Sequence, residues 1–270
     1  MAARQIEAMR RAANYLPILI TAFCILAMIV QGPIPQTENY HAFADETSFL
    51  GIPHARDVLS NLGFACVGLW GLLGLWRHRR HPGIARGWPG YALFLIGLIL
   101  TAFGSAYYHW LPDNARLVWD RLPIALVCAG LLAGVWAQTA LPPGRAGIVT
   151  GLLAVYAVLS VLWWYWTELN GQGDLRPYLL LQILPILLIP LWQAIHRTPA
   201  VERLWFGAAL LLYVLAKVAE VNDHALLAAT YSALSGHTLK HLLATAAAAA
   251  LVYRLLQAVR SAAPLAVSSR

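Results

Sequence analysis

Long apolar stretches alternate with short polar connections along almost the whole chain. A transmembrane helix needs about 20 mostly apolar residues, because the hydrocarbon core of a bilayer is about 30 Å thick. The segments that approach or reach this length are 14–31, 57–76, 90–110, 121–140, 146–166, 177–196, 203–221 and 237–258. The connections are short and we find no internal repeat. We therefore predict an all-α polytopic helix bundle that forms a single membrane domain over 1–270.

The positions of the arginines support these segments and give the bundle an orientation. If the N-terminus is cytoplasmic, most arginines fall in cytoplasmic segments, and the four on the opposite side are Arg56, Arg116, Arg121 and Arg176. Such a bias is typical of membrane proteins, and it explains the net charge of +7 without a nucleic-acid partner. The chain is 60% hydrophobic and 11% charged with a mean hydropathy of +0.62, whereas a soluble domain carries about 25% charged residues.

The first apolar segment, 14–31, allows two interpretations. Arg10 and Arg11 precede it, as basic residues precede a signal peptide. However, the apolar run is long for a signal peptide and its cleavage site is weak, so we predict a retained helix. The cysteines Cys24, Cys66 and Cys128 lie in separate apolar segments without CxxC spacing, and we expect packing thiols rather than disulfides.

Five polar residues form the candidate site: Ser105, His109, Asp120, His237 and His241. His237 and His241 are four residues apart and share a helix face, as do Ser105 and His109. The predicted spans place all five near the non-cytoplasmic side. Three imidazoles from two helices can hold one metal ion and leave a coordination position open, as in a catalytic zinc site. Haem would instead need an axial pair facing each other from different helices.

Each member of this set also has a structural alternative. A neutral histidine can form a hydrogen bond between helices. Asp120 can cap the start of a helix, and Ser105 beside Gly104 can be a small residue that permits close packing. Next to a metal ion, Asp120 would act as a proton acceptor. Ser105 would donate a hydrogen bond to a substrate carbonyl.

Charged residues also mark the seventh predicted span, in the stripe Lys217, Glu220, Asp223 and His224. Lys217 and Glu220 are three residues apart and can form an ion pair that fixes helix packing. The alternative is a proton relay or a substrate-orienting group. Lys240, between the two late histidines, can meet the acids of this stripe.

The connection before the second span is rich in acids, namely Glu38, Asp45, Glu46 and Asp57, and it also contains His41 and His54. Oxygen ligands of this kind suit a hard cation such as calcium. The spacing does not match an EF-hand, so we favour a solvated loop. Asp57 and Asn61 are four residues apart at the start of a span, and we expect them to face the core.

The pattern G-S-x3-H ending at His109, then D-x-L-P at Asp120 and H-x3-H at His237, resembles the alkaline ceramidases. These belong to the CREST superfamily of seven-helix membrane hydrolases. The resemblance covers 57–258, includes Ser60 and Asn61, and is strongest to the bacterial ceramidase-like branch. It leaves 14–31 as one extra N-terminal helix.

The resemblance implies that His109, His237 and His241 bind zinc and that Ser105 and Asp120 complete an active site. The family hydrolyses the amide bond of ceramides, so the substrate would be an N-acyl lipid entering from the bilayer. The scarcity of lysine relative to arginine suits a bacterial inner-membrane protein. Calcium dependence is doubtful, because His54 stands where the family has a glutamate of its calcium site.

Two other functions stay open at this point. The chain can be a receptor-like zinc protein without turnover, as the wider superfamily allows. It can also be a proton or ion transporter that uses Lys217, Glu220 and Asp223.

The arginine bias makes a testable prediction about orientation. Reporter fusions at Arg79 should be active in the cytoplasm, and fusions at Asp113 should be active on the opposite side. A cytoplasmic Asp113 fusion would show that the orientation is reversed.

Overall fold

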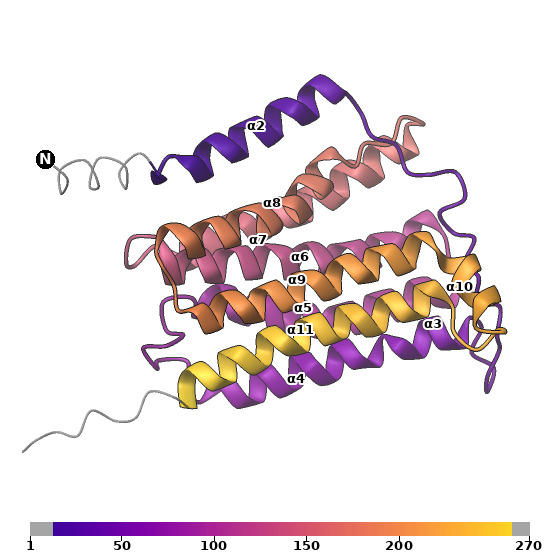
Figure 1. Cartoon of the computed structure of the whole chain (residues 1–270). Coiled ribbons are helices and arrows are strands. Elements are labelled where there is room, and N and C mark those ends of the chain that lie inside the picture. The colour runs from indigo at the N-terminus through magenta and orange to yellow at the C-terminus, as the bar shows by residue number, and fades with distance from the viewer. Residues whose placement is uncertain (1–12, 261–270) are drawn as a thin grey trace, which may run out of the picture.

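The computed structural model describes residues 13–260, which form a bundle of helices (Figure 1). Seven helices in this part of the chain are long and apolar enough to cross a membrane, and they confirm the predicted polytopic bundle. The first is Ala55–Trp76, which consists of α3 (Ala55–Ser60) and α4 (Leu62–Trp76). The others are α5 (Trp88–Trp110), α6 (Asn114–Thr139), α7 (Ala146–Leu169), α8 (Arg176–Ile195), α9 (Ala200–Val221) and α11 (Gly236–Arg260).

The segment predicted as an extra N-terminal helix, 14–31, contains α2 (Leu16–Gln31). Its retention in the mature protein stays a prediction. Helix α2 is shorter than the seven long spans, and none of its residues is buried. In Figure 1 it lies outside the bundle, along α8. Arg176 at the start of α8 donates a hydrogen bond to the Met28 carbonyl at 3.2 Å. The Leu175 amide donates to the Ile34 carbonyl just beyond α2 at 2.9 Å.

The start of α6 is the largest departure from the predicted bounds. The helix begins at Asn114 rather than at 121, because the Asp113 side chain accepts a hydrogen bond from the Arg116 amide and caps the helix. Arg121 therefore lies in the second turn of α6, where it is 3% exposed. The sequence placed Arg121 at the first position of the span, whereas it lies further inside the helix with aromatic rings around its guanidinium.

Glycines allow α5 and α6 to approach each other closely. A Cβ atom added to Gly90 would lie 2.2 Å from the Gly134 backbone nitrogen. One added to Gly104 would lie 2.0 Å from the Trp119 carbonyl oxygen. No side chain fits at either place, so the backbones themselves form the contact, as small residues permit in membrane helices. The Gly104 contact brings the end of α5 against the second turn of α6.

One end of the bundle, here called the histidine end, is where α5 finishes and α6 and α11 begin. The segment 32–54 descends along this end, and the short helix α10 (Asp223–Ala229) lies there too (Figure 1). Asp45 accepts hydrogen bonds from the Arg56 amide at 3.0 Å and the Asp57 amide at 3.2 Å, so it caps α3. Asp223 accepts from the Ala44 amide at 2.9 Å and the His237 amide at 2.7 Å. It thereby ties the segment to the first turn of α11.

These contacts correct the interpretation of the acidic loop. Asp45 and Asp57 are both buried, so the prediction of a solvated loop is wrong for them. It is correct for Glu38 and Glu46, which are exposed. The expectation that Asp57 faces the core together with Asn61 is confirmed.

The close contact between α5 and α6 predicts the effect of a single methyl group. Gly90→Ala should lower the free energy of unfolding by about 1–3 kcal/mol, because its Cβ would meet backbone that cannot move aside. The measurement is thermal unfolding in detergent. Gly151→Ala in α7 is the matched control, since nothing lies within 4 Å of its added Cβ. Equal melting temperatures for the two variants would contradict this account of the packing.

Candidate metal centre

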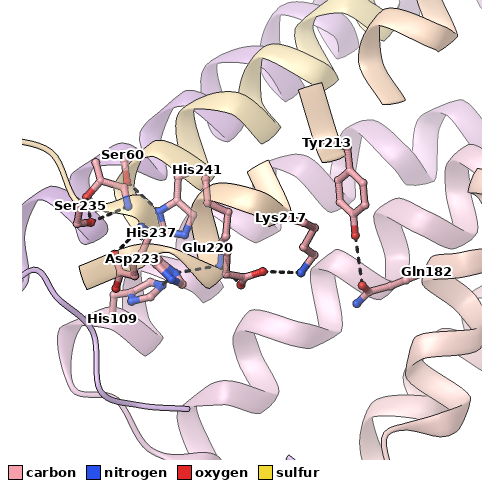
Figure 2. A network of polar contacts seen from close by, with 12 residues as sticks. Ser60, His109, Gln182, Tyr213, Lys217, Glu220, Asp223, Ser235, His237 and His241 are labelled. Atoms are coloured by element: carbon pink, nitrogen blue, oxygen red, sulfur yellow. Dashed lines mark hydrogen bonds and ion pairs between the residues drawn. The ribbon is translucent and has the colours of Figure 1, made fainter. Parts of the chain in front are cut away.

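Three buried histidines meet at the histidine end of the bundle, as the sequence predicted (Figure 2). His109 lies in the last turn of α5, while His237 and His241 occupy the first two turns of α11. Their side chains are 1%, 6% and 3% exposed, respectively. Their potential ligand atoms all lie within 4.8 Å of one another. Across residues 13–260, no other group of three His, Cys, Asp or Glu side chains meets this condition for holding a metal ion.

The hydrogen bonds of His241 leave one of its nitrogens free to bind a metal. Nδ1 of His241 lies 2.8 Å from the Ser60 hydroxyl, which itself donates to the Asp57 carbonyl at 3.0 Å. Because the hydroxyl has one proton, we assign Nδ1–H as the donor and the Ser60 oxygen as the acceptor. Nε2 of His241 then carries a lone pair. A ligating histidine is commonly oriented by such a bond through its other nitrogen.

The facing nitrogens of His109 and His237 have the spacing of two ligands of one ion. Their Nε2 atoms are 3.1 Å apart, and two nitrogens on a tetrahedral zinc ion would be about 3.3 Å apart. Nδ1 of His109 is buried and has no hydrogen-bond partner among the described residues. Neutral imidazoles suit zinc, copper, iron and nickel, so the geometry fits a metal ion without selecting one.

Lys240 extends the site toward α9, and its contact with His237 was not predicted. Its Nζ lies 3.0 Å from Nε2 of His237 and 2.9 Å from the Glu220 carboxylate. The other carboxylate oxygen of Glu220 accepts from Lys217 at 2.7 Å, which confirms the predicted ion pair. The available signal was the spacing of Lys240, three residues after His237 and therefore on a nearby helix face. Figure 2 shows the glutamate between the histidines and Lys217.

The predicted stripe does not lie on one helix, because its last two residues, Asp223 and His224, belong to α10. α9 ends at Val221, so Asp223 belongs to α10 and caps α11 instead of joining the ion pairs. His224 lies 3.2 Å from the Ala42 carbonyl through its Nε2. Deeper along α9, the Tyr213 hydroxyl donates to Gln182 of α8 at 3.4 Å. Tyr213 therefore has a partner in α8 and takes no part in the Lys217–Glu220 ion pair.

Ser105 and Asp120 are brought together by the close crossing of α5 and α6. Both are buried, and the Ser105 hydroxyl lies near enough to the Asp120 carboxylate to interact with it. The helix-cap alternative for Asp120 is wrong, because Asp113 caps α6. Close packing at this crossing is provided by Gly104. Ser105 lies one turn before His109 on α5, so this pair is adjacent to the histidine group.

The segment 32–54 covers the histidines with an aromatic side chain. The ring of Phe43 lies 4.5 Å from the rings of both His109 and His237, measured between centroids. Nearby, Nδ1 of His41 is 2.8 Å from the Tyr108 hydroxyl. The sequence offered no signal for Phe43, since an isolated aromatic residue in a polar loop has no periodic pattern.

Comparison with models of protein families and with curated proteins found no match. The functional argument therefore rests on the geometry of this chain. That geometry combines three buried nitrogen ligands, a Ser–Asp pair and a lysine held by a glutamate. Such a group can bind a metal ion, move a proton and stabilise negative charge.

The histidine geometry predicts the metal content of the purified protein. The wild-type chain should carry about one divalent transition-metal ion, because its three imidazoles converge on one point. His237→Ala, His241→Ala should remove most of it, whereas His78→Ala, at an exposed position, should keep it. The measurement is elemental analysis of protein purified without added metal. Full metal content in the double variant would refute the site.

Proposed function

We propose that this chain is an intramembrane zinc-dependent amide hydrolase that acts on a ceramide-like N-acyl lipid. It would release a fatty acid and an amine. The observation that carries the proposal is the placement of three buried histidines beside a Ser–Asp pair inside an apolar helix bundle. The sequence pattern shared with the alkaline ceramidases supports the same activity.

Zinc is the metal that best fits the donor set. The three ligands are imidazoles without a thiolate or carboxylate among them, and three protein ligands are typical of a catalytic zinc site. When bound, zinc supplies Lewis acidity toward water and toward a carbonyl oxygen. His109, His237 and His241 would hold the ion, and Ser60 would fix the ring of His241.

Asp120 and Ser105 would handle the proton and the carbonyl oxygen. The Asp120 carboxylate would accept a proton from the attacking water, with Ser105 holding it in place. Once protonated, Asp120 can donate to the Ser105 oxygen instead of accepting from it. The Ser105 hydroxyl is then free to donate to the carbonyl oxygen as negative charge develops there.

The surroundings of the site favour a lipid as the substrate. A bundle of seven apolar helices allows an acyl chain to stay in hydrocarbon while its amide reaches the histidine end. Phe43 restricts water at the histidines. The arginine bias supports a location at the non-cytoplasmic face of a bacterial inner membrane.

The Lys217–Glu220 pair supports a transporter less than it supports the proposed hydrolase. Glu220 already binds two lysines, and one of these, Lys240, contacts a candidate metal ligand. We assign this group to support of the hydrolytic site. A receptor-like zinc protein differs from the proposed enzyme by its lack of turnover.

The proposed roles of Asp120 and Ser105 predict losses of rate without losses of metal. Asp120→Asn should lower amide-lipid hydrolysis about 10²–10⁴-fold, because it removes the proton acceptor. Ser105→Ala should lower it about 10²–10³-fold, as for the loss of one oxyanion donor. Zinc content and hydrolysis are measured on the same preparations.

Asp113→Asn is the matched control, since asparagine also caps a helix and Asp113 lies outside the site. It should hydrolyse at the wild-type rate. Wild-type rates in the Asp120 and Ser105 variants, with zinc retained, would refute this mechanism. Zinc-loaded wild type without turnover would favour the receptor-like alternative.

A further inference from the structure

Arg121 is a buried cation without an acidic partner. It follows Asp120 on α6 and is 3% exposed. No carboxylate in residues 13–260 lies within 4 Å of its guanidinium, since none of the ion pairs there includes it. Its Nε and Nη1 atoms are buried and have no hydrogen-bond partner in the same part of the chain. Donors left unpaired in this way are costly, and more so on a charged group.

Aromatic rings from three other elements surround this guanidinium. Its central carbon lies 3.9 Å from the ring centroid of Trp164 in α7, 5.6 Å from that of Tyr178 in α8, and 5.0 Å from that of Tyr40 in the segment 32–54. Cation–π contacts offset part of the cost of burying the charge. They stabilise its faces, but they provide no acceptor for its N–H groups. The indole Nε1 of Trp164 is a further buried donor without a partner among the described residues.

The cage around Arg121 is connected to the candidate metal centre. Tyr40 covers the guanidinium, and Phe43, three residues later, covers the histidines. A series of ring contacts runs from Tyr40 through His41 and Tyr108 to His109, with centroid separations of 6.0, 5.8 and 4.9 Å. The same segment, through Tyr40 and Phe43, thus lies over both places.

We propose that Arg121 binds an acidic group on the head of the lipid substrate. This inference rests on the proposed function and narrows its substrate class to N-acyl lipids whose amine portion carries a phosphate or carboxylate. An anionic oxygen supplies the acceptors that Nε and Nη1 lack. Hydrogen bonds between charged groups are the strongest that a protein makes, and a dry aromatic site strengthens them further. The amide would lie at the histidines, with the acidic group at Arg121.

Two lipids that differ in one group test this assignment. N-palmitoylethanolamine is neutral, and its O-phosphate carries the same amide with an acidic head. The zinc-loaded full-length protein should hydrolyse the phosphate at least about tenfold faster in kcat/KM, the equivalent of one charge-assisted hydrogen bond. Arg121→Gln should bring this ratio close to one, and Arg121→Lys should retain part of it.

Arg116→Gln is the matched control for a lost positive charge at the same end of α6. Arg116 contacts Asp113 and the exposed ring of Tyr107, so its loss should leave the ratio unchanged. An equal ratio in the wild type and Arg121→Gln would overturn the proposal. So would a loss of preference in Arg116→Gln as large as that in Arg121→Gln, since this would indicate a general effect of charge.

Binding to a protein without the metal site separates this inference from the hydrolase proposal. The His237→Ala, His241→Ala variant should bind the phosphorylated amide at least about tenfold more tightly than the neutral one. Adding Arg121→Gln should abolish the difference, and this result would stand even if no amide is ever hydrolysed.

Two further ligands identify the source of the acidic group. Inorganic phosphate alone and palmitate alone are tested for competition with the phosphorylated amide in the same variant. Competition by both that is much weaker than binding of the phosphorylated amide is the expected result. Arg121-dependent binding of palmitate as tight as that of the phosphorylated amide would assign the arginine to the cleaved fatty acid. Equally tight Arg121-dependent binding of inorganic phosphate would assign it to a free anion. Either result would overturn the head-group assignment.

Discussion

A polar or charged side chain inside a membrane helix is costly unless another group pairs with it, and this cost explains most of the contacts at the histidine end of the bundle. Glu220 forms ion pairs with two lysines from different helices. The Ser60 oxygen accepts a hydrogen bond from His241, and the Asp223 carboxylate accepts one from the His237 amide in the first turn of α11. Polar residues placed singly along several spans therefore converge at one end, while most of the remaining length of each span is apolar. The histidine group that could hold a metal ion lies at this end as well.

How closely these polar side chains meet depends on how closely their helices pack. Ser105 and Asp120 can meet because Gly104 removes the side chain that would separate α5 from α6. In the bilayer there is no hydrophobic force to drive helices together, so packing of small residues must supply much of the attraction. Glycine at this crossing thus serves the fold and the site together. A larger residue there would move His109 as well, since it lies on the same rigid helix.

The fold and the histidine group could be predicted from the sequence because each has a strong local signal. Apolar runs of fixed length indicate spans, and the i, i+4 spacing of His237 and His241 places them on one face. The sequence did not reveal Asp113 as the cap of α6, so Arg121 was placed at the first position of the span instead of in the second turn of the helix. Phe43, the buried Asp45 and the His237 contact of Lys240 were also missed. Phe43 and Asp45 depend on contacts between segments far apart in the chain, for which spacing along one helix carries no information. The Lys240 contact did have a local signal, its spacing of three residues from His237.

Asp223 joins two parts of the site that would otherwise move independently. One carboxylate oxygen caps the turn that carries His237, and the other holds the backbone of Ala44, next to Phe43. Lifting the segment 32–54 from the histidines would therefore loosen the start of α11, and a ligand that orders His237 would hold the segment down. By thermodynamic reciprocity, a metal ion bound by the histidines would favour the position of this segment over them, and the segment in that position would favour the metal.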